Sequence, residues 1–423
     1  MKPLIINTFD QGGAPNAAIR LHLGLLNDNI NSSILFRTKS IDLPSSYVFK
    51  SKISYYQVKI NRIRQKLNGL GMKIPDNLAA ERKFIDLMKK ELEYYSYPKS
   101  KIDITENDVY ENSDVINLHW VADFLDWETF FKKNKKPLIW TLHDQNPFLG
   151  GKHYEERYYG IDKFGYPINR RISSKEIEME SCLLKSKLKI LSNINDIHIV
   201  TPSKWMMNAS INSDLFGRFT HHHIPYGFPE NTFKLLNKNF CREILCLPFD
   251  KRVILFVADS LGTARKGIAY LDQALQIIRK RNFSELLFIA VGGKDNFILG
   301  DDVINLGKIR DERMMSIVYG AADVFVIPSL EDNSPNTIVE ANLCGTPAIG
   351  FDVGGIGEII VNKKNGLLCT ELCVKSLADS IVDFFENIDK FDRELIALQA
   401  KEKYKLSVQA KAYKQLFHTV LNG

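Results

Sequence analysis

The feature that most constrains the fold of this chain is an alternation of short apolar runs with stretches of helical periodicity. The apolar runs do not alternate with polar residues, which is typical of parallel strands covered by helices on both faces. The sequence therefore predicts a doubly wound α/β architecture. The predicted strands are residues 3–9, 32–36, 115–120, 137–143, 197–203, 252–259, 286–293, 324–329 and 348–353.

The pattern breaks near residues 221–233, where two prolines and a glycine lie close together, as is typical of a crossing between domains. A length of 423 residues also suits two domains. We predict a first Rossmann-like domain at 1–225 and a second at 226–395. We expect the remaining segment, 396–423, to be a helix that packs back toward the first domain.

One segment of the first domain, about residues 45–110, departs from the alternation. Within it, residues 51–70 place apolar side chains at helical spacing with lysines and arginines between them. This pattern predicts a basic amphipathic helix. Two interpretations remain open: a solvated surface helix, or a helix that lies on an anionic membrane leaflet or on a lipid-linked acceptor.

The bulk properties exclude few functions. A net charge of +6 is too weak to indicate nucleic acid, but it suits an anionic substrate or membrane surface. The six cysteines lack zinc spacing and predict reduced, buried thiols. No signal-peptide pattern is present, and no run approaches the roughly 20 apolar residues of a membrane span. We expect a cytoplasmic protein, with peripheral contact to the inner face of the membrane left open.

Three consecutive histidines, residues 221–223, invite a metal-site interpretation. Consecutive residues of a strand point to opposite faces, so three cannot converge on one ion. The sequence instead predicts an edge strand that leads into the crossing between the domains. We expect no metal site.

The segment from Ser329 to Glu358 places a polar loop between a strand and a helix. Ser334 is the predicted N-cap, Pro335 the first helical residue and Gly345 the residue after the helix. In a parallel sheet such a loop lies at the carboxyl edge, where ligands bind.

The helix that begins in this loop can bind a diphosphate, because its first N–H groups are unpaired and its dipole is positive there. The polar residues near that end are Asn333, Ser334, Asn336 and Thr337. Asp332 and Glu340 lie roughly 8–10 Å apart along the axis, too far to share a proton but suited to binding hydroxyls on either side of a phosphate. The alternative is a pair of surface acids that flank a capped helix.

The sequence from Tyr319 to Ile360 resembles glycosyltransferase family 4. Members are retaining enzymes of the GT-B architecture, in which two Rossmann-like doubly wound domains face each other across a cleft. Their signature is a Glu, seven residues and a second Glu, followed by a Cys-Gly-Thr-Pro-like turn. Glu340 matches the second Glu, and Asp332 holds the first position with one methylene fewer. The resemblance implies that Asp332 contacts the hydroxyls of the donor sugar and Glu340 the nucleotide ribose.

The stretch around residues 255–271 also resembles the family. Lys266 matches the lysine that neutralises the donor phosphates. Ser260 stands where many members have an arginine, and we expect Arg265 to supply the second cation. The alternative is a solvated start of a helix.

Three features of the first domain extend the resemblance. Gly12 and Gly13 form a turn after the first strand, where a missing Cβ allows the backbone to approach a ligand. His119 follows a strand, where the family has a histidine that faces the donor sugar. His143 and Asp144 follow the next strand in a string similar to the branch that makes capsular and extracellular polysaccharides or O-antigen. The alternative is that both histidines are structural.

The resemblance implies a retaining hexosyltransferase that needs no cofactor or metal. It would move a sugar from a UDP- or GDP-sugar to a glycan or lipid-linked saccharide in surface polysaccharide synthesis. The expected catalytic residues are His119, Lys266, Asp332 and Glu340. Alternatives are a nucleotide-sugar-binding protein with little or no transfer, and another GT-B enzyme such as a UDP-sugar epimerase or a sugar phosphorylase. A phosphorylase based on pyridoxal phosphate would need a Schiff-base lysine, for which the sequence has no specific cue.

Overall fold

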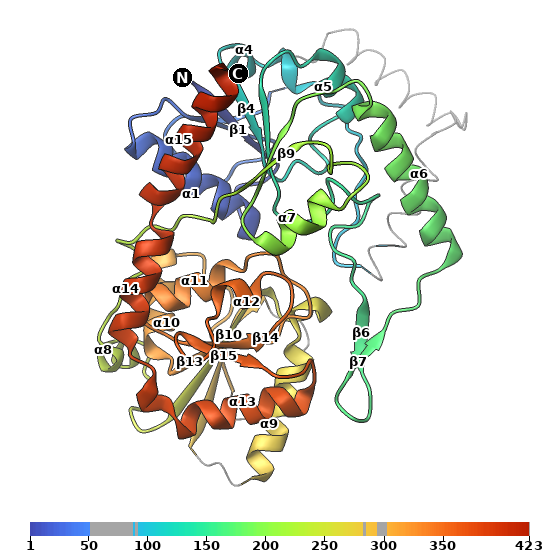
Figure 1. Ribbon diagram of the computed structural model, residues 1–423. Helices are drawn as coiled ribbons and strands as arrows, with labels where there is room; N and C mark the ends of the chain where they lie inside the picture. Colours follow the sequence, from blue (N-terminus) through green and yellow to red (C-terminus); the bar gives the residue numbers. More distant parts are fainter. Residues whose placement is uncertain (51–87, 89–91, 282–284, 294–302, 423) are drawn as a thin grey trace, which may run out of the picture.

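The computed structural model describes residues 1–50, 88, 92–281, 285–293 and 303–422. It contains two α/β domains, one above the other in Figure 1. The basic amphipathic helix expected at 51–70 lies outside the described residues. No helix in the described part of the chain combines the length and apolar character needed to cross a bilayer.

The first domain contains a seven-stranded parallel sheet with the order β3-β2-β1-β4-β5-β8-β9. Its strands are β1 (Pro3–Asn7), β2 (Ser33–Phe36), β3 (Ser46–Val48), β4 (Val115–Leu118), β5 (Leu138–Thr141), β8 (His198–Thr201) and β9 (Thr220–His223). Its helices are α1 (Gly13–Asn27), α4 (Asp108–Glu111), α5 (Trp127–Lys133), α6 (Ser174–Leu191) and α7 (Lys204–Ile211), with the 3₁₀ turn η1 (Ile104–Glu106).

The second domain contains a six-stranded parallel sheet with the order β12-β11-β10-β13-β14-β15. Its strands are β10 (Arg252–Ser260), β11 (Leu286–Gly293), β12 (Val303–Asn305), β13 (Val324–Ile327), β14 (Ala348–Phe351) and β15 (Gly366–Cys369). Its helices are α8 (Lys238–Ile244), α9 (Ile268–Lys280), α10 (Glu312–Ala321), α11 (Asn336–Leu343), α12 (Ile356–Ile359), α13 (Val374–Glu386) and α14 (Arg393–Tyr404), with the 3₁₀ turns η2 (Ala264–Lys266) and η3 (Ile388–Lys390).

Both sheets are apolar on both faces, as the uninterrupted apolar runs predict. In β1, Leu4 and Ile6 face the cluster covered by α5, α6 and α7, whereas Ile5 faces the cluster covered by α1 and by α15 (Leu406–Asn422). The second sheet is covered by α8, α10 and α11 on one side and by α9 and α13 on the other. The doubly wound architecture in two domains is therefore confirmed.

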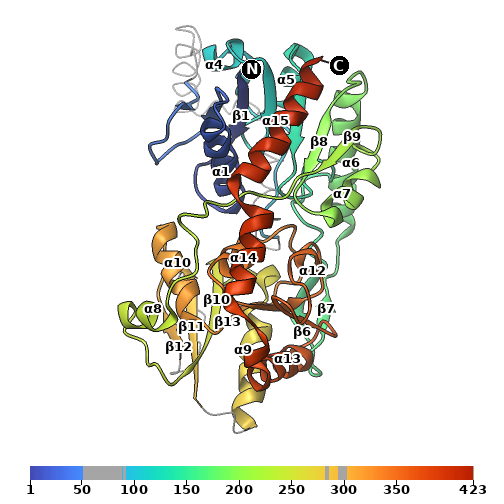
Figure 2. The same cartoon turned by 60° about the vertical axis from the view of Figure 1, so that its left-hand side comes forward.

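The last two helices belong to different domains. Figure 2 shows α14 beside the second domain and α15 over the first. Tyr413 and Phe417 of α15 are fully buried in the core that also holds α1, and the Tyr413 hydroxyl lies 2.8 Å from Thr141 Oγ1. The chain thus crosses between the domains twice, and the crossings are hydrogen-bonded to each other. The Phe228 N–H donates to the Tyr404 carbonyl, and the Leu406 N–H donates to the Phe228 carbonyl.

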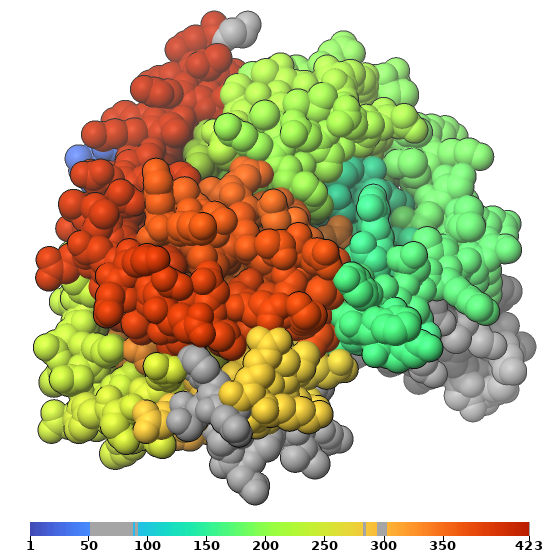
Figure 3. Space-filling model, turned by 60° about the horizontal axis from the view of Figure 1, so that its bottom comes forward, coloured from blue at the N-terminus to red at the C-terminus, as the bar shows by residue number. Residues whose placement is uncertain are grey.

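A hairpin that the sequence pattern does not predict leaves the first domain and reaches the second. It consists of the antiparallel strands β6 (Tyr158–Ile161) and β7 (Pro167–Asn169). At its tip the Val374 N–H donates to the Gly165 carbonyl at 2.9 Å, and the Tyr166 hydroxyl donates to Glu371 at 2.7 Å. Figure 3 shows this hairpin against the surface of the second domain. The domains are therefore linked by an arm as well as by the two crossings.

Two expectations about local structure are wrong. Helix α11 begins at Asn336 and not at Pro335, because Pro335 has the extended ψ of 115° that is typical of an N-cap. Ser334 is consequently one residue before the cap. Among the cysteines, Cys182 and Cys246 are exposed, since the apolar neighbours of a residue in sequence do not decide which face of a helix or turn it occupies.

The three consecutive histidines form the edge strand β9, as predicted. Their rings have separate partners: His221 contacts Ser210, His222 contacts His198, and His223 contacts the Pro202 carbonyl.

The packing of α15 makes a prediction about stability. Phe417→Ala should lower the free energy of unfolding of the first domain by about 3–5 kcal/mol, since it removes a buried aromatic ring from the core. Chemical denaturation followed by tryptophan fluorescence measures this domain, because all four tryptophans lie in it. Val408→Ala, at an exposed position of the same helix, is the control and should change the value by about 0.5 kcal/mol or less. Equal effects of the two substitutions would contradict the packing of α15.

Candidate functional site

At the carboxyl edge of the second sheet, buried Asp332 of the loop after β13 forms an ion pair with the half-buried Lys266 of η2. Lys266 Nζ lies 2.6 Å from Asp332 Oδ2, and the Arg265 guanidinium lies 3.7 Å from the same oxygen. Burial alone would raise the pKa of Asp332. The charges of Lys266 and Arg265 lower it by more than burial raises it, so the pKa is below its usual value. The carboxylate is therefore ionised and held between two cations.

A glycine turn after β14, formed by Gly354 and Gly355, packs against the backbone of this loop. Gly354 has φ +59°, and a Cβ added there would lie 1.9 Å from the Asp332 carbonyl oxygen. A Cβ on Gly355 would lie 1.8 Å from the Asn333 carbonyl oxygen, and the Gly355 N–H donates to the Asp332 carbonyl at 2.9 Å. Only glycine permits this close approach of two backbones. The turn after β14 thus fixes the position of the Asp332 loop.

Glu340, on α11, is bound by residues that the sequence analysis does not identify. Arg20 of α1 donates to Glu340 Oε1 at 2.7 Å and to Glu312 at 2.6 Å, and the Tyr319 hydroxyl donates to Glu340 Oε2 at 2.9 Å. The Arg20 guanidinium also lies 4.5 Å from the centre of the Phe228 ring. A carboxylate of the second domain is therefore paired with a buried cation of the first. In the sequence, Arg20 is one cation within an amphipathic helix, and no local signal marks it.

Two asparagines of the same loop connect it to the first domain. Asn333 Oδ1 accepts from the Ser203 hydroxyl at 2.6 Å, and its Nδ2 donates to the carbonyls of Leu142 and His143 at 3.3 and 3.1 Å. Asn336 Nδ2 donates to the Gly13 carbonyl at 3.1 Å. The predicted phosphate-binding end of α11 thus lies directly against the first domain. Ser334 and Thr337 are half-buried at the same end.

The glycine turn of the first domain lies opposite this helix end. Gly12 has φ +117°, a conformation that favours glycine, and it is the N-cap of α1. A Cβ on Gly13 would lie 4.0 Å from Asn336 Nδ2. The N-termini of α1 and α11 therefore come together from the two domains.

The predicted histidines lie at the carboxyl ends of adjacent strands and contact each other. His119 Nδ1 lies 2.9 Å from His143 Nε2, and His143 Nδ1 lies 2.6 Å from the Tyr226 hydroxyl. Burial lowers the pKa of His143 to about 4, and burial together with His143 holds the pKa of His119 well below its usual value. Both rings are therefore neutral near pH 7. Nε2 of His119 is buried and has no hydrogen-bond partner among the described residues.

Asp144 is held in a second buried chain of polar groups. Its Oδ2 accepts from Trp120 Nε1 at 2.7 Å and from His153 Nδ1 at 2.6 Å, and His153 Nε2 lies 2.8 Å from the Ser96 hydroxyl. Burial raises the pKa of Asp144, while His153 and Trp120 lower it more strongly. His153 is a residue that the sequence analysis misses, although it lies in the same string as Asp144.

The two neighbouring cations of η2 share Asp332 but differ in their other partners. Lys266 contacts Asp332, whereas Arg265 contacts Glu93 at 2.7 Å, donates to the Glu331 carbonyl, and lies over the Tyr154 ring at 4.1 Å. Arg265 also lines a large cavity.

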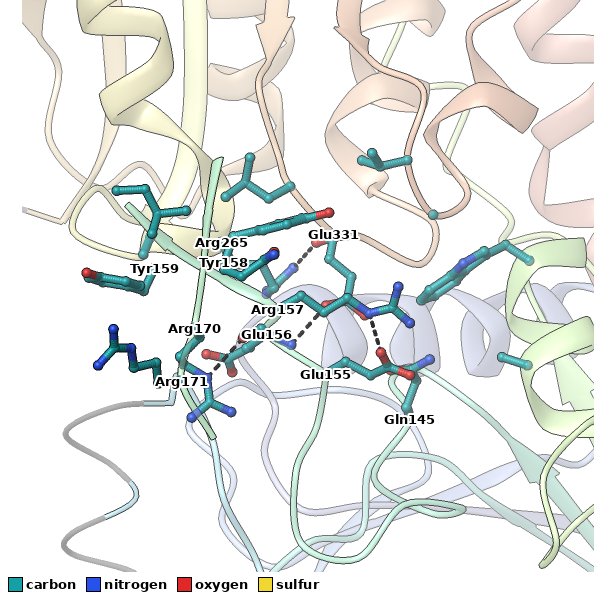
Figure 4. A pocket seen from close by; sticks show the side chains of 18 residues that line it. Gln145, Glu155, Glu156, Arg157, Tyr158, Tyr159, Arg170, Arg171, Arg265 and Glu331 are labelled. Carbon is teal, nitrogen blue, oxygen red and sulfur yellow. Dashed lines mark hydrogen bonds and ion pairs between the residues drawn. The ribbon is translucent and has the colours of Figure 1, made fainter. Parts of the chain in front are cut away.

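This cavity has a volume of about 1010 Å³ and lies between the domains beside the β6–β7 hairpin. Figure 4 shows its charged and aromatic side chains, which come from the hairpin, from α7, from η2 and from the loops after β13 and β14. The residues that carry these groups are Glu155, Glu156, Arg157, Tyr158, Tyr159, Arg170, Arg171, Trp205, Arg265 and Glu331.

Comparison with known proteins identifies the type of fold. Residues 251–387 match the family described as Glycosyl transferases group 1. An N,N'-diacetylbacillosaminyl-diphospho-undecaprenol alpha-1,3-N-acetylgalactosaminyltransferase of Campylobacter jejuni is 27% identical over 189 residues, which are 42% of this chain and 47% of that protein. The alignments with the first curated relatives cover between 34% and 37% of the relatives' own length.

Two solved structures are similar over the whole chain. Sucrose-phosphate synthase from Thermosynechococcus elongatus superimposes with a TM-score of 0.70 at 18% identity and covers 100% of this chain and 99% of its own. HepE of Anabaena in complex with UDP-glucose superimposes with a TM-score of 0.62 at 15% identity and covers 99% of this chain and 100% of its own. The chain has the GT-B fold, as predicted.

The contacts of Asn333 predict how the domains are held together. Asn333→Ala leaves the Ser203 hydroxyl and two carbonyls without their partner, at a cost of about 1–3 kcal/mol. Small-angle scattering should show a larger radius of gyration for this variant than for the wild type. Asn387→Ala, where the side chain bonds to Asp383 at the end of α13, is the matched control and should leave the radius unchanged. An unchanged radius for Asn333→Ala would contradict the bridging role.

The low pKa of His143 predicts a pH dependence of stability. An unfolded histidine binds a proton near pH 6.5, whereas folded His143 does so only near pH 4. Because the unfolded chain binds more protons in this window, stability falls as the pH falls from about 6.5 to about 4. His143→Asn should remove on the order of 2–3 kcal/mol of that loss, measured by denaturant unfolding at both pH values. An identical loss in wild type and variant would show that His143 is not held neutral.

Proposed function

We propose that this protein is a retaining glycosyltransferase of family 4 that transfers a hexose from a UDP- or GDP-sugar to a saccharide acceptor. The observation that carries the proposal is the meeting of the N-terminal end of α11 with Lys266 and the Gly12–Gly13 turn. An acid lies on either side of this point, Asp332 in the loop and Glu340 on the helix. The match to Glycosyl transferases group 1 supports it, as does the likeness to a fold solved with UDP-glucose.

In this proposal the nucleotide diphosphate occupies the N-terminal end of α11. Its N–H groups and dipole, together with Lys266 and Arg265, would stabilise the negative charge that develops on the leaving phosphate. Lys266 is paired with Asp332 in the structure, so the phosphate would share the cation with this carboxylate. Asp332 would then bind hydroxyls of the donor sugar, and Glu340 would bind the ribose.

The remaining lone pairs of Glu340 set the direction from which a ribose can approach. One carboxylate oxygen already accepts from Arg20 and the other from Tyr319. Each carboxylate oxygen can accept a further hydrogen bond. Arg20 therefore acts as a positioning residue that aims the carboxylate.

Among the described residues no carboxylate is evident as a nucleophile, so we propose front-face attack by the acceptor hydroxyl, with the leaving phosphate accepting its proton. Neutral His119 and His143 lie on the first domain next to Asp144 and would face the sugar. The bridging contacts of Asn333 and Asn336 would close the domains over the donor and limit its hydrolysis by water.

We further propose a glycan or lipid-linked saccharide as acceptor, in surface polysaccharide synthesis. The curated relative in Campylobacter jejuni, whose name contains a diphospho-undecaprenol, supports a lipid-linked acceptor. Such an acceptor would require peripheral contact with a membrane. A nucleotide-sugar-binding protein without transfer activity is the second candidate, because Asp332 and Ser260 depart from the family signature at two donor positions.

Removal of the phosphate-side cation tests the proposal. With UDP- and GDP-sugars as donors, Lys266→Ala should slow nucleotide release 10²–10³-fold, the effect of losing one group that stabilises the transition state. Lys364→Ala, an exposed lysine of the same domain, is the control. Nucleotide release is measured by chromatography, and the anomeric configuration of the product by NMR. Unchanged rates in Lys266→Ala would contradict the role of this lysine at the leaving phosphate. A product with inverted anomeric configuration would contradict the retaining mechanism.

The ribose contact has a separate test. Glu340→Gln keeps the shape of the side chain but removes its charge, and should weaken binding of UDP or GDP by about 10- to 100-fold. Isothermal titration calorimetry measures this loss. Glu394→Gln, an exposed substitution in the first turn of α14, is the control. Full nucleotide affinity in Glu340→Gln would place the ribose elsewhere.

A further inference from the structure

We propose that the cavity beside the β6–β7 hairpin is the acceptor site and that it selects a saccharide carrying an anionic group, a carboxylate or a phosphate. This inference rests on the proposed function. The cavity adjoins the candidate donor site, because η2 and the loop after β13 form a wall between them. Arg265 and Glu331 line the cavity, and Arg265 also lies 3.7 Å from Asp332, which forms the ion pair of the donor site with Lys266.

The four arginines that line the cavity differ in whether a carboxylate already holds them. Arg170 is fixed by two hydrogen bonds to Glu176, at 2.9 and 2.6 Å, and Arg265 by Glu93. Arg171 is exposed and has no ion pair with any described residue. The Arg157 guanidinium forms an ion pair with Glu155, two residues before it, and with no other carboxylate of the described residues, and its side chain is 67% exposed. Exposed pairs of this kind contribute little, so the guanidinium is available to a ligand.

Two of the three carboxylates that line the cavity accept hydrogen bonds from backbone N–H groups, and the third, Glu155, pairs with Arg157. Glu156 accepts from the Glu93 N–H at 3.0 Å, and Glu331 accepts from the Glu156 N–H at 3.1 Å. Burial raises the pKa of Glu156 to about 7 and also raises the pKa of Glu331. Two of the four lining arginines, Arg170 and Arg265, are already paired with glutamates outside the lining. The positive charge that a ligand can meet therefore comes from Arg157 and Arg171, beside two glutamates that hold their protons more tightly than usual.

The same cavity has the groups that bind sugar rings and hydroxyls. The side chain of Gln145 is buried, and its Oε1 has no hydrogen-bond partner among the described residues. It lines the cavity and can accept a hydrogen bond from a hydroxyl. Trp205 and Tyr158 contribute aromatic faces from α7 and from the hairpin. Figure 4 shows Gln145, Glu155 and Arg157 gathered on one side of the hairpin and Arg171 with Tyr159 on the other.

Binding of three small probes to the full chain tests the inference. Methyl β-D-glucuronide carries a carboxylate, glucose 1-phosphate carries a phosphate, and methyl β-D-glucoside is neutral. Ligand-observed NMR should show that at least one anionic probe binds about 10-fold or more tightly than the glucoside. The double variant Arg157→Ala/Arg171→Ala should remove this preference without weakening the glucoside. Arg281→Ala, at an exposed pair with Asp379 after α9, removes a comparable charge far from the cavity and should preserve the preference.

The outcomes separate the inference from the proposed function. Preference for the glucuronide indicates a uronate acceptor, and preference for the sugar phosphate indicates a phosphorylated one; either supports the inference. Equal binding of all three probes, or a preference that survives the double variant, overturns it. Release of nucleotide from UDP-glucose or GDP-mannose by the wild type is measured separately. If the wild type releases nucleotide but shows no preference for anionic probes, the inference about the acceptor is overturned and the proposed function stands. If it prefers anionic probes but releases no nucleotide, the result counts against the proposed transferase activity.

Discussion

The organisation of this molecule depends on hydrogen bonds that one loop of the second domain makes to the first. Asn333 joins that loop to the carboxyl ends of β5 and β8, and Asn336 joins it to the Gly13 carbonyl. The loop is also the candidate donor site. Groups that would bind a nucleotide therefore lie among the groups that hold the domains together, so that binding at this loop would be coupled to the domain arrangement.

The buried charges near this loop are paired with opposite charges. Arg20 is buried between Glu340 and Glu312, and Asp332 between Lys266 and Arg265. Taking such charges out of water is costly unless each has a partner, and the attraction in the pair offsets much of that cost. The Arg20 pairs join the two domains, whereas Asp332, Lys266 and Arg265 all belong to the second domain. A ligand phosphate would enter an environment in which the cations are already oriented.

The architecture could be predicted from the sequence, whereas most side-chain contacts of the candidate site could not. Uninterrupted apolar runs such as residues 252–259 indicate a strand buried on both faces, whereas the three-residue strands β3 and β12 are too short to leave a pattern. The boundary at Pro335 was one residue wrong because the fixed φ of proline suits both the N-cap and the first helical position. Arg20 and Tyr226 were missed, since their roles depend on partners far away in the chain. His153 was missed although its partner Asp144 is nine residues away, because a sequence does not show which way a loop turns the side chain.

The path of the last helix has a consequence for how the protein is made. Helix α15 supplies Tyr413 and Phe417 to the core of the first domain, although the whole second domain is translated between them and the rest of that core. Domains whose residues are contiguous can fold as they leave the ribosome. Here one face of the first sheet stays incompletely covered until residues 406–422 have been synthesised. Until then that face exposes apolar side chains, which makes a partly synthesised chain prone to aggregation.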